Sequence, residues 1–172
     1  MNLLDYLPTV PDFPKPGIMF KDISPLLADQ KALTYAVDQL YGLCHSYDFD
    51  YILGIESRGF IFATALALVA KKGLVLARKP NKLPKKVYSE SYGLEYGNDS
   101  LEIQQEILPH QARVLLMDDV LATGGTLLAA ANLVKQSGCQ VVGSLVLLEI
   151  AGLMGREKLA KENIPSKSLI QI

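Results

Sequence analysis

Four short apolar runs that lack polar alternation constrain the fold of this chain more than any other feature. The runs are Tyr51 to Ile55, Leu74 to Ala77, Arg113 to Met117 and Val141 to Leu148. A helical pattern from about Gly59 to Lys72 follows the first run, and a second helical pattern ends at Gly138 before the fourth. Strands that are apolar on both faces belong in a parallel sheet covered by helices on both sides. The sequence therefore predicts an α/β fold with a central, mainly parallel sheet flanked by helices.

A further helix is predicted after Asp29, whose side chain can cap it. Its apolar positions have the spacing of one buried stripe: Leu33, Ala36, Val37, Leu40, Leu43, Cys44 and Tyr47. No linker, low-complexity tract or internal repeat interrupts the chain, so residues 1–172 are expected to form a single domain.

Between the second and third apolar runs the pattern changes, because polar and apolar residues alternate from Leu101 to Ile107. The segment Tyr88 to Tyr96 precedes this alternation, and the turn residues Gly97, Asn98 and Asp99 separate the two. This arrangement predicts an antiparallel hairpin. We expect the hairpin and the loop before it, residues 78–108, to form an insertion above the edge of the sheet.

Composition favours a soluble, cytoplasmic protein. The chain is 49% hydrophobic and 20% charged, and its two cysteines have neither disulfide-framework nor metal-site spacing. The amino terminus lacks the basic region of a signal peptide, and the apolar stretch Phe60 to Ala70 falls short of the ~20 residues that span a bilayer. We therefore expect no membrane partner.

A basic cluster occupies one stretch of the chain although the net charge is −1. Its members lie within nine residues that contain no acid: Arg78, Lys79, Lys82, Lys85 and Lys86. A nucleic-acid patch is one interpretation, but the cluster has no aromatic platform beside it and the net charge argues against a large nucleic-acid footprint. We favour a small, highly charged anion as its ligand and expect no nucleic-acid partner.

The segment Val114 to Thr126, VLLMDDVLATGGT, predicts a phosphate site. An apolar strand delivers Asp118 and Asp119 to the carboxyl end of the sheet, where α/β folds bind ligands. The turn that follows consists of Ala122, Thr123, Gly124, Gly125 and Thr126. Its glycines let the backbone approach a ligand, and its amides and the next helix dipole attract an anion. The alternative is an ordinary strand-to-helix loop with a cap.

This site differs from the common nucleotide-binding motifs, because it lacks the lysine of a P-loop and the chain contains no Gly-x-Gly. Two adjacent carboxylates repel each other unless ribose hydroxyls or a hydrated Mg²⁺ bind to them and offset the repulsion. If residues 114–118 are strand, the alternation directs Asp118 and Asp119 to opposite faces unless the strand has already ended. At least one of the two acids would then hold the turn together instead of binding the ligand.

The order of strand, two acids and Ala-Thr-Gly-Gly-Thr closely resembles the 5-phosphoribosyl 1-pyrophosphate (PRPP) signature of the type I phosphoribosyltransferases. Other segments resemble the adenine-specific members of that family in the same order along the chain. They are Pro11 to Leu27, Gly54 to Phe62, Arg78 to Gln104 and the tail AGLMGREKLA. The resemblance implies transfer of phosphoribosyl from PRPP to N9 of adenine, giving AMP and pyrophosphate, with Mg²⁺ as the cofactor.

The resemblance also assigns residues to the PRPP site. The ribose and its 5′-phosphate would be held by Asp118, Asp119, Ala122, Thr123, Gly124, Gly125 and Thr126. Mg²⁺ would be held mainly by the substrate, with Asp118 or Asp119 acting through water. The pyrophosphate would be bound by Glu56, Ser57, Arg58, Gly59, Arg78, Lys79 and Lys82. Arg58 is alternatively a surface arginine. Residues from Arg78 to about Asn98 would form a mobile lid, in which Lys85 and Lys86 are alternatively solvated.

The amino-terminal segment 1–28 would form a hood over adenine, in which Phe20 stacks on the ring and the backbone of Met19 reads its edge. Lys21 stands where many family members carry arginine, so the charge is kept but a bidentate contact is not. Phe20 is alternatively an ordinary core residue.

For catalysis, the resemblance implies that Glu95 exchanges a proton with the purine, that Tyr96 covers the site, and that Arg58 holds the leaving group. Family members are commonly homodimers. Two alternatives stay open: a phosphoribosyltransferase for a 6-oxopurine, namely xanthine, hypoxanthine or guanine, and a PRPP-binding regulator without chemistry.

Overall fold

The computed structural model of the chain describes residues 1–93 and 99–172. The chain divides into two compact units, Met1–Gln39 and Leu40–Ile172. In the first unit, a 3₁₀ helix (Leu3–Tyr6) precedes β1 (Thr9–Val10) and β2 (Phe20–Lys21), which pair antiparallel, and α1 (Ser24–Ala28) follows them.

Helix α2 (Gln30–Cys44) begins in the first unit and continues into the second. The backbone N–H of Ala32 donates to Asp29 Oδ1 over 2.8 Å, which confirms the predicted cap. On the stripe, Ala36 and Leu40 are completely buried.

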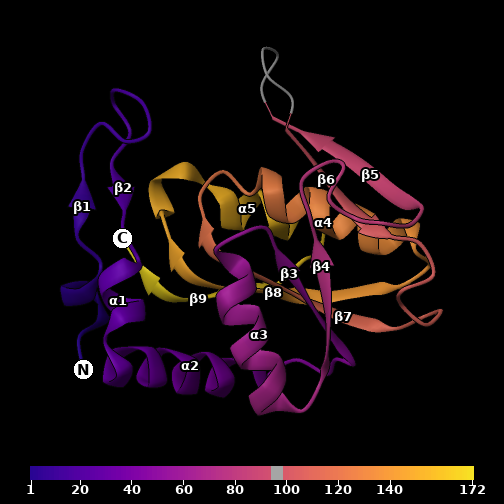
Figure 1. Cartoon of the computed structure of the whole chain (residues 1–172), viewed down its shortest axis with the longest axis horizontal. Coiled ribbons are helices and arrows are strands. Elements are labelled where there is room, and N and C mark those ends of the chain that lie inside the picture. Colours follow the sequence, from indigo (N-terminus) through magenta and orange to yellow (C-terminus); the bar gives the residue numbers. More distant parts are fainter. Residues whose placement is uncertain (94–98) are drawn as a thin grey trace. The chain divides into compact units, whose positions relative to one another are not determined.

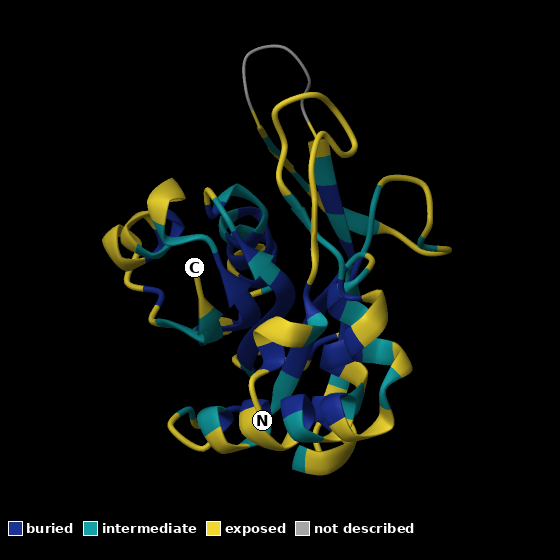
Figure 2. Ribbon diagram, turned by 90° about the vertical axis from the view of Figure 1, so that its left-hand side faces the viewer, coloured by how far each residue is buried: buried dark blue, intermediate teal, exposed yellow. Residues whose placement is uncertain are grey.

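A parallel sheet forms the centre of the second unit, and within the described residues it has five strands in the order β4-β3-β7-β8-β9. The strands are β3 (Tyr51–Ile55), β4 (Gly73–Ala77), β7 (Arg113–Leu121), β8 (Gln140–Glu149) and β9 (Ser166–Gln171). Figure 2 shows the central strands as the most deeply buried part of this unit. The predicted α/β class with a central parallel sheet is confirmed.

The order of the strands creates a switch point between β3 and β7. From β3 the chain passes through α3 (Gly59–Ala70) outward to β4, whereas from β7 it passes through α4 (Gly125–Gln136) in the opposite direction to β8. Because parallel crossovers are right-handed, α3 and α4 cover opposite faces of the sheet (Figure 1). Helix α5 (Gly155–Lys161) connects β8 to β9 on the α4 side. Ligands of such folds bind where the loops diverge.

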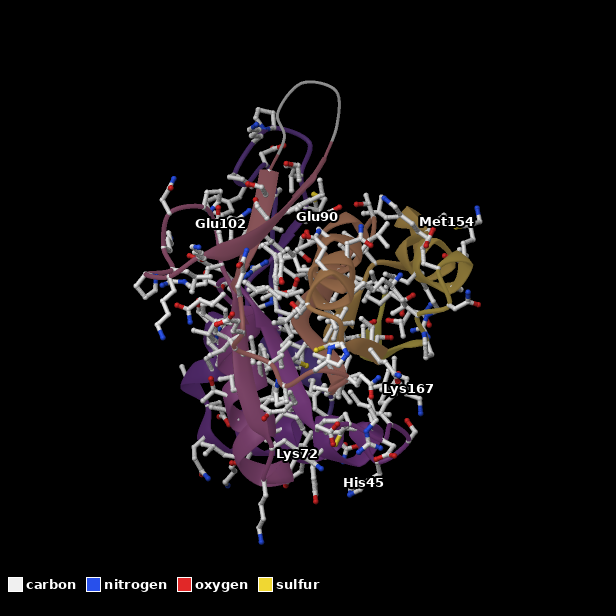
Figure 3. The ribbon with its side chains drawn as sticks, turned by 90° about the vertical axis from the view of Figure 1, so that its right-hand side faces the viewer. His45, Lys72, Glu90, Glu102, Met154 and Lys167 are labelled. Carbon is white, nitrogen blue, oxygen red and sulfur yellow. The ribbon has the colours of Figure 1, made fainter. Side chains whose placement is uncertain are left out.

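The predicted hairpin is present as β5 (Val87–Tyr92) and β6 (Asp99–Gln104), with Tyr88 opposite Ile103. An isolated antiparallel bridge between Arg78 and Glu102 attaches it to the end of β4, at the edge of the sheet. The Glu90 carboxylate accepts hydrogen bonds from Asn132 Nδ2 (3.0 Å) and Gln136 Nε2 (2.8 Å) of α4 (Figure 3). These bonds fix β5 against α4.

Two predicted strand ends are wrong. β7 continues beyond Met117 to Leu121, so that Asp118 and Asp119 lie inside the strand. β6 stops at Gln104 rather than Ile107, because Glu106 has φ of 62° and the left-handed conformation ends an extended strand.

Helix α3 ends at Ala70 rather than Lys72, because Lys71 adopts a left-handed φ of 55°. β9 and α5 are elements that the apolar runs did not predict. Within residues 1–93 and 99–172, no helix is long and apolar enough to cross a membrane.

Helix α3 is apolar on both its faces. Phe62, Ala63 and Leu66 are completely buried on the sheet side. On the outer side Leu68 is 75% exposed and Val69 42%. A helix that is apolar all round is usually covered on every side.

Candidate active site

Two loops lie together at the switch point between β3 and β7. One is Glu56–Gly59, after β3, and the other is Ala122–Gly125, after β7. A Cβ on Gly59 would lie 2.7 Å from Asp118 Oδ1 and 3.0 Å from Asp118 Cα. Glycine at this position therefore lets the start of α3 pack directly on β7, which brings the two loops together.

The phosphate loop, Ala122 to Thr126, surrounds a cavity of about 110 Å³. The cavity is lined by Asp118 and by Val120 to Leu127. Gly124 has φ of 82°, a conformation that glycine adopts readily, and α4 begins immediately after it. The first amides of a helix have no acceptor within it, and the helix dipole places partial positive charge beside them. The cavity is thus suited to a phosphate group.

The two acids of β7 are both buried: Asp118 is 7% exposed and Asp119 6%. Asp118 Oδ1 accepts a hydrogen bond from the Asp119 backbone N–H over 2.8 Å. Burial first, and then the Asp119 charge, raise the pKa of Asp118 well above its ordinary value. A ligand that brings hydroxyl groups or a cation to this pair would relieve the repulsion.

Arg58 joins the first loop to the second carboxylate. Its Nε lies 2.8 Å from Asp119 Oδ2, and its side chain is 34% exposed. The peptide bond between Glu56 and Ser57 is cis. Thus a guanidinium and a carboxylate lie side by side where the two loops meet.

Glu56 holds the basic loop, Arg78 to Lys82, with its buried carboxylate, which is 8% exposed. Oε2 accepts from the Lys79 backbone N–H (2.7 Å) and pairs with Arg78 Nε (3.3 Å), and Oε1 pairs with Lys82 Nζ (2.6 Å). Burial disfavours the charged form, but the hydrogen bonds from Lys82, Lys79 and Arg78 outweigh it and lower the pKa of Glu56. The structure therefore brings the predicted pyrophosphate residues together.

Lys79 connects the basic loop to the hairpin. Its Nζ donates to Tyr92 Oη over 3.0 Å and forms an ion pair with Asp99. Burial alone would lower the pKa of Lys79, but these hydrogen bonds raise it. A Cβ on Gly125 would lie 3.7 Å from Tyr92 Cδ2, so the tyrosine also reaches the phosphate loop. Sequence reasoning missed Tyr92, and it interpreted Asp99 only as a turn residue.

The residues predicted to bind adenine lie in the first unit. Phe20 packs edge-on against Phe13, with ring centroids 4.9 Å apart. Lys21 Nζ donates to the Leu7 carbonyl over 3.4 Å, and Met19 is 61% exposed. Phe20 is half-buried and lies on β2, so it is not a core residue of this unit.

The remaining predicted residues contribute less. Glu95 and Tyr96 lie outside the described residues. Lys85 and Lys86 are exposed. In the part of the chain that the structure describes, no group of three or more histidine, cysteine or acidic side chains is arranged to hold a metal ion.

A phosphate cavity, buried acids and a paired basic loop at one switch point define a class of protein that binds phosphorylated ribose. Comparison with known proteins supports this class: the family model for the phosphoribosyl transferase domain matches residues 22–169. A relative from Polynucleobacter asymbioticus, named adenine phosphoribosyltransferase, is 61% identical over 99% of both chains. The chain therefore belongs to the phosphoribosyltransferase family and, within it, to the adenine phosphoribosyltransferases.

Solved structures show the same fold. The crystal structure of adenine phosphoribosyltransferase from Thermoanaerobacter pseudethanolicus is 42% identical, with a TM-score of 0.94 over 99% of this chain and 100% of that one. The Saccharomyces cerevisiae enzyme, solved in complex with an imino-altritol bisphosphate and adenine, is 36% identical, with a TM-score of 0.89 over 97% and 96% of the two chains.

Proposed function

We infer that this chain is a Mg²⁺-dependent adenine phosphoribosyltransferase, which transfers the 5-phosphoribosyl group of PRPP to N9 of adenine and releases pyrophosphate. The observation that carries this inference is the phosphate cavity beside two buried carboxylates at the switch point. The 61% identity to a protein named for this activity supports the choice of adenine.

The phosphate loop binds the 5′-phosphate. Thr123 and Thr126 add hydroxyl donors to the amides of Gly124 and Gly125. Asp118 lines the same cavity and accepts from the ribose hydroxyls. Because charged hydrogen bonds to a phosphate are strong, this loop fixes the sugar before reaction.

The leaving pyrophosphate binds between the Glu56–Gly59 loop and the basic loop. Arg78 and Lys82 both pair with Glu56 there, and Arg58, on the first loop, pairs with Asp119. Pyrophosphate replaces the carboxylates as the partner of these cations. Neutralisation of the leaving group is the main contribution to the rate that these side chains make.

In the reaction the bond from C1′ to the pyrophosphate oxygen breaks, and a bond from C1′ to N9 of adenine forms with inversion. The sugar acquires cationic character between these events. N9 loses its proton to Glu95, and Tyr96 excludes water from the sugar. By resemblance to the family, residues 78–108 form the lid over PRPP.

Mg²⁺ fits the acids of β7. Asp118 and Asp119 are buried neighbours, and burial first, then the Asp119 charge, raise the pKa of Asp118. A cation would offset both effects by stabilising the carboxylate. Mg²⁺ keeps much of its water and is commonly held by few carboxylates and by substrate oxygens. Asp118 or Asp119 would hold it through water, and it would supply positive charge to the pyrophosphate.

Adenine binds the first unit, where residues 1–28 form the hood. Phe20 stacks on the purine, with its ring orientation fixed by Phe13. The backbone of Met19 reads the purine edge. Lys21 donates to the Leu7 carbonyl, so it acts within the hood.

The outer face of α3 supports a homodimer. Leu68 and Val69 there are apolar and exposed, and a second copy of the chain would cover them. We place the enzyme in the cytoplasm, where its two free, buried cysteines would stay reduced.

Pyrophosphate release tests the proposed function directly. The assay supplies PRPP with adenine, hypoxanthine, guanine or xanthine in turn, with and without Mg²⁺. Adenine with Mg²⁺ should give release, and chelation should abolish it. Release with an oxopurine and not with adenine would favour a 6-oxopurine enzyme, and no release with any purine would favour a non-catalytic PRPP-binding regulator.

A further inference from the structure

The segment Ala151–Ala160, AGLMGREKLA, has no part in the chemistry described above, yet it packs against the phosphate loop. It contains a 3₁₀ turn, Ala151–Leu153, and the start of α5 at Gly155. Figure 3 labels Met154, the residue that immediately precedes α5.

Gly155 is in close backbone contact with the loop. A Cβ added to it would overlap the Ala122 carbonyl oxygen and would lie 2.7 Å from Leu121 Cδ1 and 3.0 Å from the Gly124 nitrogen. Conversely, a Cβ on Gly124 would lie 3.0 Å from the Gly155 carbonyl oxygen. Only glycine at position 155 allows the two backbones to approach this closely.

Arg156 fixes Gly155 in place. Its Nε lies 2.9 Å from Glu149 Oε1, and a second nitrogen pairs with Oε2 of the same carboxylate. Arg156 Nη1 donates to the Ser166 carbonyl over 2.6 Å, and Nη2, the nitrogen that pairs with Oε2, also donates to Ser168 Oγ over 2.9 Å. Ser168 Oγ also donates to Glu149 Oε2 over 2.7 Å. The guanidinium thereby ties the start of α5 to β8 and β9.

Glu149 is a strong anchor, because it is 3% exposed and lies at the end of β8. The hydrogen bond from Arg156 lowers the pKa of Glu149, so the carboxylate is charged at neutral pH. The next residue, Ile150, donates its backbone N–H to the Leu121 carbonyl over 2.9 Å. The anchor is therefore joined to the strand that carries the phosphate loop.

We propose that Arg156 and Gly155 are positioning residues for the phosphate loop. Arg156 is held by Glu149 and keeps Gly155 packed against Ala122 and Gly124. This packing keeps the backbone amides of the phosphate loop directed at the 5′-phosphate. Neither residue touches the substrate. This inference rests on the proposed function, because it assumes that the loop binds a 5′-phosphate.

Calorimetric binding of two probes, ribose 5-phosphate and pyrophosphate, tests the proposal. Gly155→Ala adds one methyl group against the phosphate loop, and Arg156→Met removes the guanidinium that Glu149 holds. Each should weaken ribose 5-phosphate binding by about tenfold or more, the effect of losing one hydrogen bond to a charged group. Pyrophosphate binding should stay unchanged. In steady state, KM for PRPP should rise while KM for adenine stays constant.

Gly152→Ala is the matched control, because its Cβ would have no atom within 4 Å. It should bind both probes as the wild type does. Glu149→Gln keeps a hydrogen-bond acceptor for Arg156 but removes the charge, so it tests the ion pair if Arg156→Met fails to fold. It should weaken ribose 5-phosphate binding and leave pyrophosphate binding unchanged, and unchanged binding of both probes would overturn the role of Arg156.

The outcomes separate the two claims. If the wild type binds no ribose 5-phosphate, the proposed function fails, and the positioning role fails with it. If the wild type binds it and Gly155→Ala binds equally well, the positioning role alone is overturned. Equal losses for both probes would mean general damage to the fold and would also overturn the positioning role.

Discussion

The phosphate loop and the basic loop are assigned to two ends of the same substrate, but they carry positive charge differently. Ala122 to Thr126 contains no charged side chain, and its backbone packs directly against Gly155. The basic loop uses flexible cations, and Glu56 holds Arg78 and Lys82 in this structure.

This difference separates two strategies for binding phosphate. Fixed amides pay no ordering cost when the ligand arrives, but a small displacement removes several hydrogen bonds together. Paired side chains can exchange a carboxylate for a pyrophosphate, and each contributes separately. Damage to the phosphate loop should therefore be severe, and damage to the basic loop should be gradual.

Gly124→Ala should produce the largest effect. The position has φ of 82°, and the new Cβ would lie 3.0 Å from the Gly155 carbonyl oxygen, so the loop must shift. Loss of two hydrogen bonds to a charged phosphate, about 2 kcal/mol each, corresponds to about a 10³-fold fall in kcat/KM for PRPP. Steady-state kinetics measures it, with Gly42→Ala as control, because a Cβ there meets no atom within 4 Å. A fall of less than about tenfold would show that the loop is not rigid.

Glu95→Gln tests a residue that belongs to neither loop. The two loops bind the phosphate groups of PRPP, whereas Glu95 is proposed to exchange a proton with the purine. Its replacement should therefore lower kcat by about 10²-fold or more and leave KM for PRPP unchanged. The kcat is measured with adenine in excess, and the exposed Glu162→Gln is the control. An unchanged kcat would remove Glu95 from the mechanism.

Lys82→Met should have a moderate effect. The Lys82 side chain is 48% exposed, so its interaction is screened, and KM for PRPP should rise by about fivefold. The increase of KM with salt should also become shallower, because one charge is lost. Lys85→Met, in an exposed position, should change neither quantity. A loss as large as that of Gly124→Ala would contradict the distinction between the two loops.

The sequence predicted the features that depend on neighbours along the chain. The limits of β3 and the Gly-rich turn before α4 follow from an apolar run and from turn chemistry, and both are confirmed. β9 was missed because its residues, SKSLIQ, are half-exposed and do not form an apolar run. A run of buried residues identifies a central strand better than an edge strand.

Pairings between distant residues could not be predicted from the sequence. Nothing local indicates that Glu56 pairs with Lys82, or that Glu149 pairs with Arg156, because the fold brings these side chains together. A useful signal was nevertheless present, since Glu149 ends an apolar run as Asp118 does. A buried acid at the end of a strand requires a partner.

Asp118→Asn should have the smallest effect and acts on stability. The raised pKa of Asp118 means that its negative charge destabilises the folded protein at neutral pH. Removal of that charge should increase the free energy of unfolding by about 1 kcal/mol, which raises Tm by about 2–4 °C. PRPP binding should weaken in the same variant, because the carboxylate that accepts from ribose is lost.

The pH dependence of the free energy of unfolding shows whether the charge of Asp118 stabilises or destabilises the folded protein. A carboxyl whose folded-state pKa is raised contributes stability below its unfolded pKa of about 4, and this contribution is lost as the pH rises through the folded pKa. The stability advantage of Asp118→Asn over the wild type should therefore grow with rising pH, whereas the contribution of Glu149 is common to both proteins and cancels. Thermal melts across pH measure this difference, with the exposed Asp38→Asn as control. An advantage that shrinks as the pH rises would mean that Asp118 is stabilised as an anion, and the phosphate loop would then also depend on a charged side chain beside it.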